Sequence, residues 1–326
     1  MDIDLRVLKT LEREAEIPFA ELVAIIEAAI LAAYHKHIGN SDSARAELNR
    51  TTGAVHIFAP VLDEEGNSTG EIEVTPENFG RVAAYAAKQV IANRLRDIND
   101  ENLLGEFKGK EGDIVAGVIQ QGQKPYMVYV DLGSIEAIMP PEEQVPGEDY
   151  SHGKRIRVYV TAVNKGTRGG PMVTVSRTHP SLVRKLFALE VPEIASGVVE
   201  IVSLAREAGH RTKIAVRAHE AGVNAKGSCI GELGQRVRAV QAELNEEKID
   251  IVDFSDDLPA FVAQALSPAK VTSAYMLDSA TKSVRVLVPD FQLSLAIGKE
   301  GQNARLAAKL TGAKIDIQPD SILDGE

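Results

Sequence analysis

The stretch Ile297-Gly298-Lys299-Glu300-Gly301-Gln302-Asn303-Ala304-Arg305 places two glycines around a two-residue tip. An alternating strand pattern at 284–288 and a short apolar run at 293–297 precede it, and an Ala- and Leu-rich helix pattern at 302–310 follows it. Glycine permits positive φ and a close approach to a ligand. The helix after the second glycine offers free N–H groups and its positive dipole end. The stretch therefore predicts a phosphate-binding turn between two helices.

The same arrangement occurs a second time in the chain. Cys229-Ile230-Gly231-Glu232-Leu233-Gly234-Gln235-Arg236-Val237-Arg238 has glycines at the same spacing. Nearly identical strands, Lys248-Ile249-Asp250-Ile251 and Lys314-Ile315-Asp316-Ile317, close the two copies. One Gly-x-x-Gly match is weak evidence, because ordinary helix–helix turns use it too. A duplicated helix–strand–strand–helix–turn–helix–strand unit is specific. It predicts two type II KH domains, at 181–256 and 257–320, whose loops clamp about four nucleotides of single-stranded RNA.

The two loops and the residues after them are the predicted RNA contacts. Glu232 at the first tip should repel a phosphate, so we expect Lys299 at the second tip to bind more strongly. The first loop is then expected to act as a backbone N–H clamp, supported by Arg236 and Arg238. The predicted residues are Gly231, Glu232, Leu233, Gly234, Arg236, Arg238, Gly298, Lys299, Glu300, Gly301, Gln302 and Arg305.

Residues 107–180 have a different pattern. Five closely spaced strands, at 113–119, 126–132, 135–139, 155–163 and 172–176, predict a small OB-type β-barrel. The pieces Gly112-Asp113-Ile114-Val115-Ala116-Gly117-Val118-Ile119 and Val130-Asp131-Leu132-Gly133 resemble an S1 RNA-binding barrel. Such barrels stack bases on aromatic side chains within a basic groove. Tyr126 and Arg157 are the candidates here; Tyr129 cannot share a strand face with Tyr126.

The N-terminal segment, 1–106, predicts an acidic α+β domain. Helix patterns cover 3–16, 18–37 and 76–98, and short strand patterns cover 54–61 and 71–74. The wide apolar faces of the helices are expected to form the core of the domain. The alternative is a groove that receives a helix of a partner.

Charge is unevenly distributed along the 326 residues, whose net charge is −11. Residues 1–106 carry 10 basic and 19 acidic side chains, whereas 107–182 have a net charge of +1 and 183–326 of −3. The stretch 206–238 holds seven basic and three acidic residues. This predicts a modestly basic face on an acidic body, with weak, salt-sensitive RNA binding.

Several function classes are disfavoured by what the sequence lacks. The single cysteine, Cys229, excludes an intramolecular disulfide and a multi-cysteine zinc site. No run of 18 apolar residues and no leader are present, which predicts a cytoplasmic protein without a membrane partner. An RNA-processing or RNA-degrading protein that carries KH and S1 domains as accessory modules is the alternative. The sequence has no GxxxxGK[ST] loop and no grouped His, Ser and Asp, so we expect no enzyme activity, no catalytic or metal residues and no cofactor.

The whole chain resembles a known family. Ser176-Arg177-Thr178-His179-Pro180-Ser181-Leu182-Val183-Arg184-Lys185-Leu186-Phe187 and Val288-Pro289-Asp290-Phe291-Gln292-Leu293-Ser294-Leu295-Ala296-Ile297 are similar to the bacterial NusA family of transcription elongation, termination and antitermination factors. So is the order of an acidic domain, an S1 barrel and two KH domains.

The resemblance implies a role for each part. It implies that the N-terminal domain binds RNA polymerase near the RNA exit channel, while the S1–KH–KH body holds nascent single-stranded RNA. It also implies effects on pausing, termination and antitermination, together with other Nus-type factors. Arg184 and Lys185, on the helix that joins barrel and KH domain, are added to the predicted RNA contacts. We expect a monomer, with a short tail at 321–326 in place of the acidic repeats that some family members carry.

Overall fold

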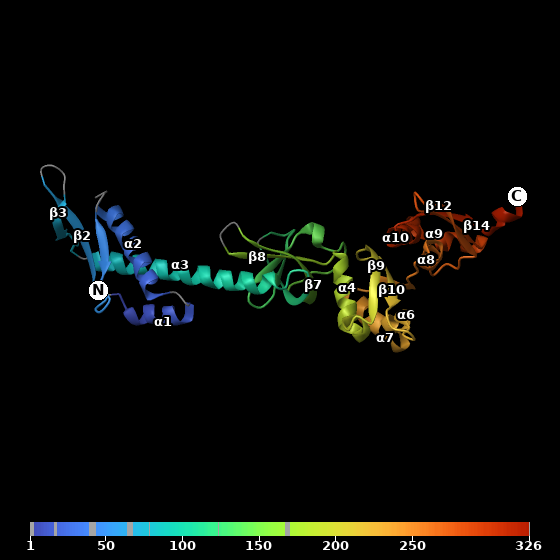
Figure 1. Cartoon of the computed structure of the whole chain (residues 1–326), viewed down its shortest axis with the longest axis horizontal. Helices are drawn as coiled ribbons and strands as arrows, with labels where there is room; N and C mark the ends of the chain where they lie inside the picture. Colours follow the sequence, from blue (N-terminus) through green and yellow to red (C-terminus); the bar gives the residue numbers. More distant parts are fainter. Residues whose placement is uncertain are drawn as a thin grey trace. The chain divides into compact units, whose positions relative to one another are not determined.

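The computed structural model describes residues 3–15, 18–38, 44–63, 68–77, 79–122, 124–166 and 170–325. Figure 1 shows the elements along the chain, from α1 near the N-terminus to β14 near the C-terminus. The chain divides into two compact units. One comprises Met1–Gly105 with Lys165–Pro171, and the other comprises Glu106–Asn164 with Met172–Glu326.

The N-terminal domain has the predicted mixture of helices and strands. Its helices are α1 (Leu5–Ala15), α2 (Phe19–Ile38) and α3 (Phe79–Lys108). Its antiparallel sheet has the order β1 (Arg45–Leu48), β2 (Val55–Leu62), β3 (Ser68–Glu73). Apolar side chains of α2 and the start of α3 form a core with the centre of β2, through residues such as Ile26, Ile57 and Phe79.

Three features of this domain differ from the prediction. Helix α3 continues to Lys108, ten residues past its predicted end at 98. Strand β1 was not predicted, because it has only four residues. Strand β3 lies a few residues earlier than predicted, because every one of its side chains is exposed and no alternation marks it. The predicted end of the second helix at Gly39-Asn40 and most of the predicted turn at 63–67 lie outside the described residues.

The barrel confirms the S1-type prediction. Its strands are β4 (Ile114–Gln120), β5 (Val128–Asp131), β6 (Glu136–Met139), β7 (Arg155–Lys165) and β8 (Pro171–Ser176), and a 3-10 turn, η1 (Pro141–Glu143), follows β6. They close in the order β4-β5-β6-β8-β7. Alternate side chains point inward, including Ile119, Val130 and Val158. At Gly117 a Cβ would lie 2.5 Å from Cγ1 of Val130, so close strand packing requires glycine there.

The two KH domains repeat one topology, which confirms the predicted order of elements. The first contains α4 (Pro180–Glu190), α5 (Pro192–Ala195), β9 (Val199–Glu207), β10 (Arg211–Ala218), α6 (Ala225–Ile230), η2 (Glu232–Gly234), α7 (Gln235–Glu243) and β11 (Lys248–Asp253). The second contains α8 (Leu258–Ala265), β12 (Ser273–Asp278), β13 (Ser283–Val288), η3 (Asp290–Gln292), α9 (Leu293–Ile297), η4 (Lys299–Gly301), α10 (Gln302–Thr311), β14 (Lys314–Pro319) and η5 (Asp320–Gly325). In each sheet the middle strand is antiparallel to the first strand and parallel to the last.

The sheet of the first KH domain is covered on both faces. Its own helices pack on one face, and α8 and α10 of the second KH domain pack on the other. Ala205, Ala215 and Val252 of the first domain share a buried cluster with Phe261 and Leu306 of the second. The two KH domains therefore form one packed body.

Candidate nucleic-acid interface

The two Gly-x-x-Gly corners have nearly the same backbone. The first glycines have φ 74°, ψ 172° (Gly231) and φ 78°, ψ 169° (Gly298). The second tip residues have φ 49°, ψ 24° (Leu233) and φ 53°, ψ 27° (Glu300). The last glycines have φ 75°, ψ 17° (Gly234) and φ 73°, ψ 13° (Gly301). Each corner contains a non-glycine residue with positive φ, which costs energy unless the surrounding structure holds it. The repeat that is visible in the sequence thus extends to the conformation.

Close packing at each corner requires its first glycine. A Cβ on Gly231 would lie 2.6 Å from Cγ of Arg236, and a Cβ on Gly298 would lie 2.8 Å from the backbone N of Asn303. Both positions also have positive φ. Arg236 and Asn303 each fold back over the corner and bond to the preceding helix: Arg236 Nη1 to the Ser228 carbonyl at 2.7 Å, and Asn303 Nδ2 to the Ala296 carbonyl at 2.9 Å.

The helices that follow the corners, α7 and α10, have no side-chain cap at their N-termini within the described residues. Helices α4, α6 and α8 are instead capped by His179, Asn224 and Asp257. The tips face solvent, and the Leu233 side chain is 88% exposed. At each corner the amides of both glycines donate to backbone carbonyls, as do those of Gln235 and Gln302. Each corner therefore presents its two tip amides and a positive helix end to an anion.

Side chains at the first corner leave one nearby cation available. The guanidinium of Arg236 is held by Glu193 at 2.9 Å, in addition to its bond to Ser228. Arg238 is exposed, its Nη1 lies beside Gly234, and it has no ion-pair partner among the described residues. The acidic tip residue Glu232 is exposed as well. The predicted supporting role for Arg236 thus coincides with a structural role in holding α6 to α7.

Side chains at the second corner are engaged across the boundary between the KH domains. Arg305 Nε donates to Oε1 of Glu207 at 2.6 Å, and Gln302 Nε2 donates to its Oε2 at 2.8 Å. Arg305 Nη1 also donates to the Glu300 carbonyl at 3.3 Å. Together with Lys299 and His210 these residues line a cleft of about 300 Å³. In the sequence, Glu207 is only one of the three acidic residues in the basic stretch at 206–238, and no pattern there predicted its contact with the second corner.

Most of the basic stretch at 206–238 is neutralised in the fold. Carboxylates pair with Arg206, Arg211, Lys213, Arg217 and Arg236. Only Lys226 and Arg238 of the seven have no ion-pair partner among the described residues. The basic face is therefore much weaker than the sequence count predicts.

The remaining predicted contacts lie on the barrel and the joining helix. Arg184 donates to the Ile201 carbonyl, and burial lowers the pKa of its guanidinium. Lys185 Nζ lies 3.3 Å from Oδ1 of Asp113. The joining helix therefore directs both side chains toward neighbouring protein groups.

Tyr126 is the exposed aromatic of the barrel. It is 57% exposed, and Lys124 Nζ lies 6.0 Å from the centre of its ring. The ring of Tyr129 packs against Gly122, which places it in the barrel wall. The predicted strand at 126–132 is shorter in the structure, because β5 begins at Val128 and Tyr126 lies in the turn before it, so the two tyrosines do not share one strand, contrary to the prediction. Arg157 Nη1 is paired with Glu243 of the first KH domain at 2.8 Å.

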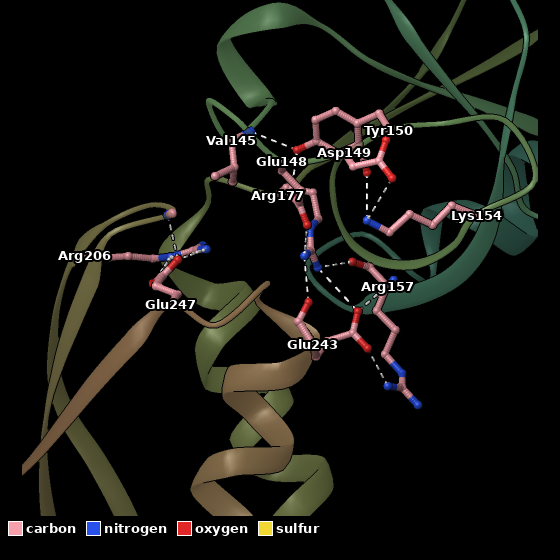
Figure 2. Close-up of polar contacts among 11 residues, drawn as sticks. Val145, Glu148, Asp149, Tyr150, Lys154, Arg157, Arg177, Arg206, Glu243 and Glu247 are labelled. Carbon is pink, nitrogen blue, oxygen red and sulfur yellow. Dashed lines mark hydrogen bonds and ion pairs between the residues drawn. The ribbon is translucent and has the colours of Figure 1, made fainter.

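A buried ionic network joins the barrel to the first KH domain (Figure 2). Arg177, 2% exposed, pairs with Glu148 and donates to the Glu243 carbonyl at 2.7 Å and to the Arg157 carbonyl at 2.9 Å. Beside it, the rings of Tyr159 and His179 stack with centres 4.4 Å apart. Arg177 lies in the segment 176–187 that resembles the family, but no role was predicted for it from the sequence. Its partners are distant in the chain, so no local pattern reveals them.

A second buried pair stabilises the same region (Figure 2). Arg206 and Glu247 side chains are 1% and 0% exposed and lie 2.9 Å apart. Glu247 also accepts from Thr212 Oγ1 at 2.5 Å and from the Gly209 N–H at 2.8 Å. Burial alone raises the pKa of Glu247, but the hydrogen bonds and charge of Arg206 outweigh it and hold that pKa below its usual value. Barrel and KH domains thus form one platform.

The described part of the chain offers little for other chemistry. It contains no group of three or more His, Cys, Asp or Glu side chains that could hold a metal ion. Burial raises the pKa of the Cys229 thiol to about 12, which makes that cysteine unreactive at neutral pH. None of the described helices is both long enough and apolar enough to span a bilayer.

Four family models match consecutive parts of the chain. The NusA N-terminal domain matches residues 5–101, and the S1 RNA binding domain matches 108–170. The NusA-like first KH domain matches 177–254, and the NusA-like second KH domain matches 258–324.

Similar proteins extend over almost the whole length. The transcription termination/antitermination protein NusA of Mycobacterium tuberculosis is 55% identical over 328 residues, which cover 98% of this chain and 94% of that protein. The protein of the same name from Bacillus subtilis is 46% identical over 336 residues, covering 96% and 90%. Among solved structures, the N-terminal domain of NusA from B. subtilis is 34% identical, covers 28% of this chain and 93% of its own, and has a TM-score of 0.25.

Proposed function

Because the chain belongs to the NusA family of transcription termination/antitermination proteins, we propose that it acts without catalysis, by holding RNA polymerase and nascent single-stranded RNA at the same time. The observation that carries the RNA part is the pair of uncapped helix N-termini with matching Gly-x-x-Gly geometry on one packed body. Family membership favours this function over that of an accessory module in RNA processing.

In the proposed mechanism, the RNA backbone lies across both corners. Phosphates lie against 231–234 and 298–301 and are held by the tip amides at 232–233 and 299–300, and bases lie against the adjoining helix and strand edges. Lys299 and Arg238 supply charge. Since few cations are free, we expect modest affinity that falls as salt is raised. Weak contacts of this kind suit a protein that must let a growing transcript move past it.

The RNA part is tested by replacing Gly298 and Gly301 with Asp. The new side chains add negative charge and crowding where phosphate should approach, so affinity for a fluorescent single-stranded oligoribonucleotide should fall at least about tenfold. Gly197→Asp is the control matched to Gly301→Asp, because both glycines have positive φ and open space around them, and Gly197 lies between α5 and β9, outside the two corners. Unchanged anisotropy titrations for the double variant would refute the clamp.

The N-terminal domain is the proposed polymerase-binding part. Between α1 and α3 it has a mostly apolar groove of about 300 Å³ lined by Ile3, Asp4, Val7, Ala84, Ala87, Lys88 and Ile91. An apolar groove between helices suits a helix of a partner protein, and the domain carries a net charge of −9 that disfavours RNA. Other Nus-type factors are expected to join at the same complex.

This assignment is tested in the full chain with Val7→Glu. Val7 is 48% exposed, so the fold should tolerate the charge while the groove loses its apolar character. We expect capture of purified core polymerase to be lost and RNA affinity to stay the same. Leu62→Glu, at a 57% exposed apolar side chain outside the groove, is the control. Equal polymerase capture by both variants would count against the groove.

The absence of catalysis is tested separately. Purified protein is incubated with labelled RNA, nucleotides and Mg²⁺, and we expect neither specific cleavage nor nucleotide turnover. Either activity would point to the RNA-processing alternative.

A further inference from the structure

Equivalent donors of the two KH domains have different partners. In the second domain, Gln302 and Arg305 both donate to one carboxylate, Glu207, which ends β9 of the first domain. In the first domain the equivalent residues, Gln235 and Arg238, are exposed and have no such partner among the described residues. Among the described residues, only the second corner has an internal carboxylate that accepts from this pair of Gln and Arg side chains.

Glu207 holds its partners at the corner itself. Arg305 bonds the Glu300 carbonyl at 3.3 Å while its Nε bonds Glu207 at 2.6 Å, so the guanidinium bridges the loop and the carboxylate. The Glu207 side chain is 21% exposed and lines the cleft together with Lys299. A phosphate that enters this cleft meets donors that are already occupied.

The charges of the cleft cancel. Lys299 and Arg305 are balanced by Glu207 and Glu300. Hydrogen bonds from Arg305 and then from Gln302 hold the pKa of Glu207 below its usual value, so it is ionised at neutral pH. Without Glu207 the cleft would have one net positive charge, which would favour a phosphate.

We propose that Glu207 competes internally with RNA phosphate at the second KH domain. Carboxylate and phosphate oxygens bind the same fork of guanidinium donors. RNA that occupies the second corner replaces Glu207 on Arg305 and Gln302. Because the bonds to Glu207 must be broken for RNA to bind and form again when it leaves, Glu207 lowers RNA affinity and speeds RNA dissociation. The inference rests on the proposed function, because it concerns the affinity of the same RNA site.

A simple tether is the structural alternative. The two KH domains are already held by a buried apolar cluster and by Lys213, whose Nζ donates to the Ser267 carbonyl at 2.7 Å. The Arg305 side chain is 48% exposed, and ion pairs with such exposure contribute little to stability. A competitive role and a tethering role predict opposite changes in RNA affinity.

The test is Glu207→Gln in the full chain, which removes the charge and keeps the shape. We expect a single-stranded oligoribonucleotide to bind about three- to tenfold more tightly. Because Arg305 becomes free to neutralise a phosphate, the slope of log K against log salt should steepen by about 0.7. Glu190→Gln, an exposed acid at the end of α4, has the same change of net charge and should do neither.

A double variant identifies the donor. If Arg305 is the donor, Glu207→Gln should raise RNA affinity in the unaltered chain but not in a chain that already carries Arg305→Gln. Equal or weaker binding by Glu207→Gln, or a gain that persists without Arg305, overturns the proposal. If the unaltered chain binds RNA and the Gly298 and Gly301 variant does not, these results bear on Glu207 alone. An unaltered chain that binds no RNA at low salt refutes the proposed function and the inference with it.

Discussion

The two KH domains place the same pair of charges in the same register, yet in different surroundings. Lys213 on β10 lies opposite Asp250 on β11, and Arg285 on β13 lies opposite Asp316 on β14. Lys213 is fully buried and donates to the Ser267 carbonyl just after α8, whereas the Arg285 side chain is 37% exposed. The comparison teaches that the energetic weight of a repeated residue depends on what packs against its sheet.

A second position distinguishes the domains in the same way. Glu247 and Ala313 each directly precede the last strand of their domain, and both are buried. Glu247 binds Arg206, which in turn donates to the His179 carbonyl at 3.0 Å near the barrel. The first domain thus holds buried charges on both sides because it lies between two neighbours. The second domain has an alanine at this position.

The largest difference is expected from Lys213→Ala compared with Arg285→Ala. Lys213→Ala empties a fully buried side-chain position and leaves the Ser267 carbonyl without its donor, which together cost about 3–5 kcal/mol even though Arg211 still holds Asp250 at 2.8 Å. Lys213→Ala should lower the urea midpoint of the barrel–KH unit by a corresponding amount, whereas Arg285→Ala should leave it nearly unchanged. Similar losses in the two variants would show that burial by the second domain does not matter.

A smaller and pH-dependent effect is expected from Glu247→Gln. The amide keeps the shape but loses the charge-assisted bonds to Arg206, so stability at pH 7 should fall by about 2–3 kcal/mol. The folded pKa of Glu247 lies below the unfolded value, so its contribution is full above about pH 4.5 and is lost as pH falls through the folded pKa. Urea unfolding at pH 7 and pH 3 should therefore show a gap between wild type and variant that narrows in acid. A gap that is constant with pH would contradict the assignment.

The smallest effects are expected at the tips of the corners. Glu232→Lys should strengthen binding of single-stranded RNA, and Lys299→Glu should weaken it, each by about tenfold, because each reverses one charge near phosphate. Anisotropy titrations at two salt concentrations measure both. An effect at Lys299 without one at Glu232 would mean that only the second corner holds RNA, and the functional symmetry of the two domains would be lost.

Local patterns in the sequence predicted most of the fold. Glycine spacing, strand alternation and helix periodicity depend on neighbours within a few positions, so they predicted the duplicated corners and the five-stranded barrel. Elements without such patterns were missed or shifted: β1 is too short, and β3 is exposed throughout. Helix α3 was predicted to end at 98, although it continues to Lys108.

Partners of charged residues were not predicted, and they change the candidate site. Arg236 was expected to support a phosphate, and the fold commits it to Glu193 and Ser228. Arg177 pairs with Glu148 and Glu243, and Arg305 pairs with Glu207, across large separations in the chain. Charge counted along a stretch therefore overestimates the charge that is free to meet RNA.

By itself the sequence determined the order of the domains, the two glycine corners and their backbone, because glycine conformation and side-chain periodicity are properties of short segments. Only the tertiary structure decided which of the basic side chains pair with a carboxylate and which do not. Coulomb attraction acts through space between residues that the fold brings together, and a linear pattern does not contain those distances.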